Sequence, residues 1–138
     1  MENKAEVKTA KTNVLKAKSE ALSVRIMKMD FYLKKQTDCP SSISNQILRS
    51  GTSICANIAE SFNAESKSDF IHKLSVALKE ADETLSWAKN IKACYNVNQE
   101  AFTTLLDDIN EIRYILIASI KTSKANMVKS SSHKEDNI

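Results

Sequence analysis

Apolar residues recur along the chain with the three- and four-residue spacing of an α-helix, in four separate segments. The segments are residues 12–36, 41–62, 67–95 and 99–124. Their apolar stripes contain Leu15, Leu22, Ile26, Met29 and Leu33; Ile43, Ile47, Ile54 and Ile58; Phe70, Leu74, Ala77, Leu78, Ala81, Leu85, Ala88 and Tyr95; and Phe102, Leu105, Ile109, Ile112, Leu116 and Ile120. Short polar connections force each helix to run antiparallel to the one before it. The pattern therefore predicts an all-α, up-down-up-down four-helix bundle.

The helix ends carry recognisable capping residues. Ser66 with Asp69 three positions later is typical of a capping box, and Asn98 is the expected cap of the last helix. Pro40 suits the start of the second helix. The pattern predicts a single domain over residues 1–125 and a disordered tail over 126–138, where no helical period continues.

Glycine and proline each occur once, as Gly51 and Pro40. So few turn residues exclude a β-sandwich, a barrel and a glycine-rich phosphate loop. Inside a helix, Gly51 costs about 1 kcal/mol of helix propensity relative to alanine. We therefore expect it to mark a close approach by another helix.

Two helices carry a second apolar stripe, placed about 140–200° from the first. These residues are Val24, Met27 and Phe31 on the first helix and Val76, Trp87 and Cys94 on the third. They are interpreted either as a subunit interface, which favours Trp, Phe and Met, or as scattered surface hydrophobes. Residues 112–120 are apolar nearly all round, which predicts a well-covered position for the last helix.

Positive charge gathers near the N-terminus. The chain has 20 basic and 17 acidic residues, for a net charge of +3, whereas residues 1–36 alone hold nine basic and four acidic ones. The candidate phosphate-contacting residues are Lys16, Lys18, Arg25, Lys28, Lys34 and Lys35. The alternative is a solvated charged face.

A polar stripe runs along the second helix, opposite its apolar one. It consists of Arg49, Ser53, Asn57 and Glu60. From the spacing alone it is either a solvated face or a hydrogen-bonded seam against a neighbouring subunit.

The sequence contains no credible catalytic, cofactor-binding or metal-binding constellation. It has two histidines, and Asp69 with His72 is a lone near-match to a di-iron motif. Cys39, Cys55 and Cys94 lack CxxC spacing, so we expect free thiols, as in a reducing cytoplasm. No run is apolar and long enough for a membrane span, and no signal peptide is recognisable. We therefore expect a cytoplasmic protein that is not an enzyme and has no small-molecule substrate.

The run Gln46–Glu60, followed by Ser66–Thr84, resembles the bacterial four-helix-bundle proteins encoded in 23S rRNA intervening sequences. The accessory variability protein of diversity-generating retroelements belongs to the same broad group. The resemblance covers residues 12–122, and Cys55 stands where the family often has glycine.

The resemblance implies assembly into a ring-shaped homopentamer. The retroelement branch implies a basic surface for RNA or DNA and a reverse transcriptase as partner. The leading hypothesis is a non-enzymatic oligomer that binds nucleic acid or a nucleic-acid enzyme. The alternative is a structural protein–protein scaffold without a nucleic-acid partner.

Overall fold

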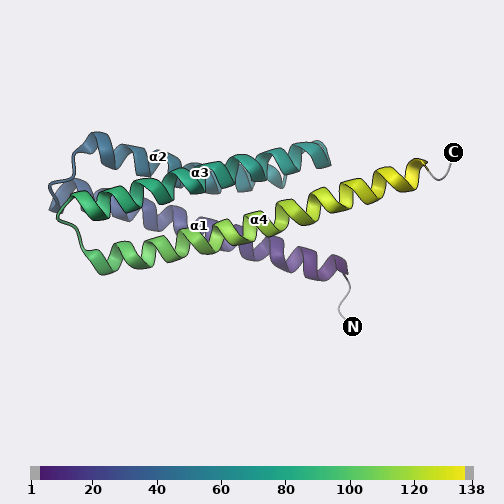
Figure 1. Ribbon diagram of the computed structural model, residues 1–138. Helices are drawn as coiled ribbons and strands as arrows, with labels where there is room; N and C mark the ends of the chain where they lie inside the picture. Colours follow the sequence, from purple (N-terminus) through teal and green to yellow (C-terminus); the bar gives the residue numbers. More distant parts are fainter. Residues whose placement is uncertain (1–3, 136–138) are drawn as a thin grey trace.

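The computed structural model describes residues 4–135, with side chains from residue 14 to residue 130. It consists of four helices, α1 (Lys4–Gln36), α2 (Ser41–Ser61), α3 (Lys67–Cys94) and α4 (Gln99–Glu135), with no strand in the described range (Figure 1). The α1–α2 and α3–α4 connections lie at one end of the bundle, and α1 begins and α4 finishes at the other. The predicted all-helical class and the four helices are confirmed.

Two helix boundaries differ from the prediction. α1 begins at Lys4, eight residues earlier than expected, and α4 continues to Glu135. Residues 126–135 are therefore helical where the sequence predicts disorder, and residues 136–138 lie outside the described range. The chain has no glycine or proline after Gly51, and lysine, alanine and methionine all favour helix, so nothing stops α4 where its apolar period ends.

The expected caps of α3 and α4 are present. The Ser66 hydroxyl accepts a hydrogen bond from the Asp69 backbone N–H at 3.0 Å, and the Asp69 carboxylate accepts one from the Glu65 N–H at 3.2 Å. At the start of α4, the Asn98 side-chain oxygen accepts from the Ala101 N–H at 3.0 Å. These bonds satisfy backbone donors that a helix start leaves unpaired and fix where each helix begins.

The core consists largely of the predicted apolar stripes. Its fully buried side chains include Ile26, Leu33, Ile47, Ile54, Ile58, Leu74, Ile91, Phe102, Leu105, Ile109, Ile112 and Leu116. Ile91, which the predicted stripe of α3 omits, is one of them, whereas Phe70, Leu78, Leu85 and Tyr95 of that stripe are only partly buried. The close approach predicted for Gly51 is also present, because α1 lies against it through Ile26.

The bundle is least closed between its first and last helices. α2 packs extensively on both α1 and α3, and α3 on α4, whereas α1 and α4 share few contacts. This open side exposes the flank of α1 that carries several of the predicted phosphate-contacting residues.

Candidate nucleic-acid and subunit interfaces

Three of the six basic residues predicted to contact phosphate are held by ion pairs. Lys18 and Arg25 reach Glu111 and Asp108 of α4, each at 2.6 Å. Lys34 pairs with Asp30 within α1 at 2.8 Å and donates a hydrogen bond to the Asn45 side chain at 2.7 Å. A neutralised cation attracts phosphate weakly, so these three are the poorer candidates.

The other three, Lys16, Lys28 and Lys35, are exposed. None has an ion-pair partner among the side chains that the structure describes. The structure thus divides the predicted set into three available lysines and three paired cations.

Arg25 is the main polar link across the open side of the bundle. Besides its ion pair with Asp108, its guanidinium donates to the Ala101 carbonyl at 2.9 Å and to the Thr104 hydroxyl at 2.5 Å. Open hollows of about 290 and 280 Å³ lie in the groove between α1 and α4, and Arg25 lines both. Arg25 therefore acts first as a clamp between α1 and α4. The α1–α4 register needed to find this role is not visible in the sequence.

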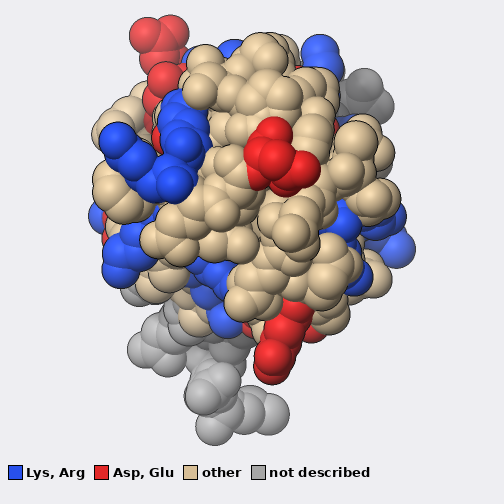
Figure 2. All heavy atoms as spheres, turned by 90° about the vertical axis from the view of Figure 1, so that its left-hand side faces the viewer, with Lys and Arg blue, Asp and Glu red and all other residues tan. Residues whose placement is uncertain are grey.

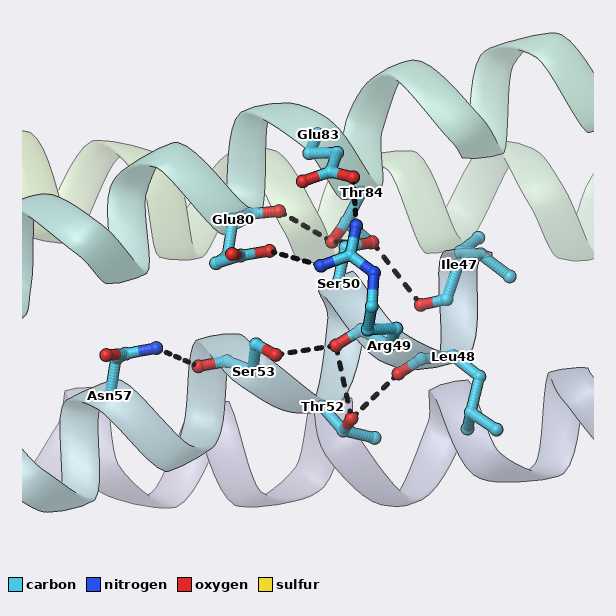
Figure 3. A network of polar contacts seen from close by, with 10 residues as sticks. All are labelled: Ile47, Leu48, Arg49, Ser50, Thr52, Ser53, Asn57, Glu80, Glu83 and Thr84. Carbon is cyan, nitrogen blue, oxygen red and sulfur yellow. Dashed lines mark hydrogen bonds and ion pairs between the residues drawn. The ribbon is translucent and has the colours of Figure 1, made fainter. Parts of the chain in front are cut away.

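The polar stripe of α2 is a seam with α3 of the same chain (Figure 3). Arg49 forms ion pairs with Glu83 and, at 3.7 Å, with Glu80. At the other end of the stripe, Glu60 pairs with Lys73 at 2.9 Å. The charged ends of the stripe therefore have partners inside the bundle, although Arg49 and Glu60 remain exposed.

The middle of the stripe is bonded along α2 itself. The Ser53 hydroxyl donates to the Arg49 carbonyl at 2.7 Å, and the Asn57 amide donates to the Ser53 carbonyl at 2.8 Å (Figure 3). Both side chains are half-buried. The spacing leaves two interpretations of this stripe open, a solvated face and a hydrogen-bonded seam against a neighbouring subunit. The contacts of the stripe resemble a seam, but they are formed within a single chain.

A buried hydroxyl pair, missed by the sequence analysis, lies beside this seam. The Thr84 hydroxyl donates to the Ser50 hydroxyl at 2.9 Å, and both residues are fully buried between α2 and α3. Ser50 and Thr84 lie beside the apolar stripes of their helices. That position, a small polar residue at the edge of a core stripe, is the sequence signal that could have identified the pair.

The second apolar stripe of α1 is exposed, as predicted. The exposed fraction is 63% for Phe31, 51% for Val24 and 53% for Met27. Met27 lies two turns before Lys34, which bonds Asn45 of α2, so this stripe borders the α2 flank of α1.

The second stripe of α3 needs correction. Trp87 is half-buried and packs against the core. The helical angles predict the opposite, that Trp87 cannot share the intramolecular core. Trp87 lies one turn after Glu83 and Thr84, whose side chains contact α2, so it lies on the flank of α3 that borders α2. Val76 is half-buried as well, and Cys94 is exposed.

The last helix is less covered than its sequence predicts. Tyr114 is 68% and Ile117 43% exposed. Ile117 lies one turn after Arg113, which pairs with Asp82 of α3 at 2.5 Å, so this apolar patch borders the α3 flank of α4. Among the described side chains, exposed apolar patches therefore lie on α1 and on α4.

On α1 the available lysines and the exposed hydrophobes share one surface. Val24, Lys28, Phe31 and Lys35 follow one another at spacings of four, three and four residues, which is a single stripe of a helix. The predicted nucleic-acid surface and the predicted subunit interface thus overlap here.

Burial raises the pKa of two side chains at the connection end of the bundle. Desolvation raises the pKa of the Cys39 thiol, with the Asp38 carboxylate adding to the effect, and raises the pKa of the nearby Tyr95 phenol. All three cysteines are free thiols. Within the described part of the chain, no three His, Cys, Asp or Glu residues gather as metal ligands would.

The family described as 23S rRNA-intervening sequence protein matches residues 11–118. The chain belongs to this family. The match agrees closely with the residues 12–122 over which the sequence resembles it.

A solved relative supports the membership. It is the crystal structure of a protein of unknown function from the S23 ribosomal protein family of Bacteroides thetaiotaomicron. The two chains share 42% identity with a TM-score of 0.77, over 80% of this chain and 98% of the other. No curated protein matches the chain. Among the described residues, no helix of this family member combines the length and apolar character that crossing a membrane requires.

Proposed function

We propose that this family member is a non-enzymatic, self-associating cytoplasmic protein that binds RNA or DNA through a basic surface. The observation that carries the proposal is the division of the α1 cations. Lys16, Lys28 and Lys35 stay exposed without a carboxylate partner, whereas the cations beside α4 are neutralised. Unpaired lysines on a rigid helix are the groups that gain most from contact with phosphate, because binding releases counterions.

Such contacts are expected to be tolerant of sequence. Lysines that reach the sugar-phosphate backbone position a protein on nucleic acid but do not distinguish one base from another. A nucleic-acid enzyme, such as the reverse transcriptase that the retroelement branch implies, would fit as a protein partner working on the same nucleic acid.

Self-association is supported by the two exposed apolar patches. The α1 patch borders α2 and the α4 patch borders α3, so the two lie on opposite sides of the bundle. When unlike faces on opposite sides of a protein dock, the contact is heterologous and can close into a ring. The pentameric number itself rests on the family resemblance.

The second candidate function is a structural scaffold without a nucleic-acid partner. It is favoured by the shared stripe of α1, because Phe31 and Val24 cannot be buried against another subunit while Lys28 between them contacts phosphate. If that stripe is a subunit interface, its lysines can contact phosphate only where they extend to the solvent-exposed rim of the interface.

A filter-binding experiment separates the two candidates. The full chain is mixed with a structured RNA and, separately, with a duplex DNA at low salt and at physiological salt. Retention that is strong at low salt and falls steeply with salt supports nucleic-acid binding. Absence of retention at low salt, with the helical circular-dichroism spectrum intact, overturns it and leaves the scaffold. Sedimentation of the same sample tests self-association.

A further inference from the structure

The net positive charge of the chain comes from two helical segments, one at the start of α1 and one at the end of α4. We define the N-terminal arm as residues 4–16 of α1 and the C-terminal arm as residues 121–135 of α4. Leu15 is the first buried core residue that the structure describes on α1, and Ile120 is the last residue of α4 that packs against the core. Each arm has four lysines and one glutamate, a net charge of +3. Residues 17–120, between the arms, have twelve basic and thirteen acidic residues.

The fold brings these two distant segments of the sequence to the same end of the molecule. α1 begins and α4 finishes on the right-hand side of Figure 1, opposite the α1–α2 and α3–α4 connections. The sequence does not reveal that the two arms lie at the same end, because it predicts a disordered tail in place of the C-terminal arm. Lys16, Lys121 and Lys124 are exposed and have no ion-pair partner among the described side chains.

The opposite end of the bundle lacks such a concentration. Figure 2 looks onto it and shows mostly uncharged surface, with Lys and Arg in separate groups and Asp and Glu residues among them. Of the exposed lysines near this end that have no ion-pair partner among the described side chains, Lys35 shares its stripe with exposed hydrophobes and Lys89 lies on a different helix, α3.

The N-terminal arm also departs from the pattern of a helix that packs in a bundle. Residues 4, 8 and 11 continue the spacing of Leu15 and Leu22, so lysine occupies the positions at which the core stripe would otherwise continue. The sequence of this arm therefore provides a row of lysines in place of an apolar stripe, which suits a polyanion.

We propose that the two arms together form the surface that holds the sugar-phosphate backbone of a double-stranded nucleic acid. This inference rests on the proposed function and places its main contacts away from the shared stripe of α1. Each arm covers about 20 Å at 1.5 Å per residue, enough to meet several phosphates of a duplex that carries one charge per ~1.7 Å.

Two other occupants fit the arms less well. A second copy of the arms would bring together segments that each carry +3, so like charges would repel. A helix that lies on a membrane needs a large apolar face with Trp, Phe or Leu. The described part of the C-terminal arm offers only Met127 and Val128 as large apolar side chains.

The test compares two triple variants with the same change in charge. The arm variant is Lys16→Gln, Lys121→Gln and Lys124→Gln. The control variant is Lys28→Gln, Lys35→Gln and Lys89→Gln, which removes three exposed lysines without ion-pair partners from the rest of the bundle. All six residues are on the surface of helices, so both variants should keep the circular-dichroism spectrum and the sedimentation coefficient of the parent.

Affinity for a short RNA duplex and a short DNA duplex is measured by fluorescence anisotropy over a series of salt concentrations. We expect the arm variant to lose about tenfold in affinity at low salt. The slope of log affinity against log salt concentration should become shallower by about three, one for each lysine. The control should change the slope by less than about one.

Three other outcomes overturn the inference, and they are distinguishable. Equal losses of affinity in both variants mean that exposed lysines on the arms and on the rest of the bundle contribute alike. The contacts are then not localised on the arms, while the proposed nucleic-acid binding stands. A larger loss in the control places the contacts on the bundle body and also leaves that function standing. If the parent protein binds neither duplex at low salt but binds phosphatidylserine vesicles, both the proposed function and the duplex surface are wrong.

Discussion

Gly51 of α2 lies so close to Ile26 of α1 that a Cβ atom on residue 51 would sit 2.8 Å from both Cγ1 and Cγ2 of the isoleucine. Both residues are fully buried, and neither backbone can withdraw without opening the α1–α2 contact. The glycine therefore fixes the distance between two helices at the centre of the bundle.

We expect Gly51→Ala to destabilise the protein by about 1–2 kcal/mol. Overpacking costs about 1–3 kcal/mol, and the better helix propensity of alanine returns about 1 kcal/mol or less. Denaturant unfolding followed by circular dichroism measures the change. Ala56→Gly is the control at an exposed position of the same helix, where propensity alone acts. If Gly51→Ala is as stable as the parent, the close approach does not restrict this site.

The extent to which the sequence predicts this structure depends on how local each feature is. The Ile47–Ile54–Ile58 stripe, the Ser66 cap and the Gly51 approach follow from spacing within one helix, and all are present. The expectation that Trp87 cannot share the intramolecular core is wrong, because its burial depends on contacts with neighbouring helices. The angular position of a residue on its own helix does not show how much of that helix a neighbouring helix covers.

The candidate site is less predictable for the same reason. The six cations of α1 look equivalent in sequence. Lys18 and Arg25 are nevertheless neutralised by α4, because the register between α1 and α4 places them beside carboxylates more than 80 residues away in the sequence. A local signal does exist, since Lys18 and Arg25 are one heptad apart and face two carboxylates one turn apart on an antiparallel helix. The basic C-terminal arm was missed because the end of the apolar period was equated with the end of the helix.

Arg25→Gln should weaken the open side of the bundle. The change removes an ion pair with Asp108 and hydrogen bonds to Ala101 and Thr104, for an expected loss of about 1–2 kcal/mol in unfolding free energy. Lys18→Gln is the matched control, because Lys18 makes one exposed ion pair in the same groove and should cost about 0.5 kcal/mol or less. Equal effects of the two substitutions would show that the additional bonds of Arg25 do not stabilise the fold.

If the proposed self-association uses the α1 patch, Phe31→Glu should abolish it without unfolding the bundle. Phe31 is 63% exposed and makes little contact with the core, so a charge there costs the monomer little but cannot be buried between subunits. Sedimentation velocity measures the assembly, and circular dichroism the fold. Phe62→Glu, on the α2–α3 connection, is the control for an exposed phenylalanine outside the α1 patch. An unchanged sedimentation coefficient for Phe31→Glu would remove α1 from the interface.

Trp87→Glu should behave differently from Phe31→Glu. Trp87 packs on the core and is half-buried, so a carboxylate at this position should destabilise the monomer by about 2 kcal/mol. The urea midpoint should fall even at concentrations where the parent is dissociated. A variant that loses assembly but keeps the parental midpoint would restore Trp87 to the subunit interface.

Alkaline pH should destabilise the fold, because the resolved pKa shifts all have the same sign. Burial raises the pKa of Cys39 above its ordinary value of 9.0 and that of Tyr95 above 10.0, and the hydrogen bond from Lys73 to Glu60 raises the pKa of the lysine above 10.5. A raised pKa means that the folded protein holds the proton more tightly than the unfolded chain does. The stabilising contribution is then complete below the unfolded pKa and is lost as the pH rises through the folded one.

We therefore expect the urea midpoint to be flat near neutral pH and to fall above about pH 9. Cys39→Ala removes the group with the lowest ordinary pKa of the three, 9.0, and should delay the onset of that fall, because an alanine has no proton to lose. Cys55→Ala, at a half-buried thiol of α2, is the matched control and should leave the onset where it is in the parent. If both alanine variants give the same alkaline profile as the parent, ionisation of the buried Cys39 thiol does not limit stability, and the loss must be assigned to Tyr95 and Lys73.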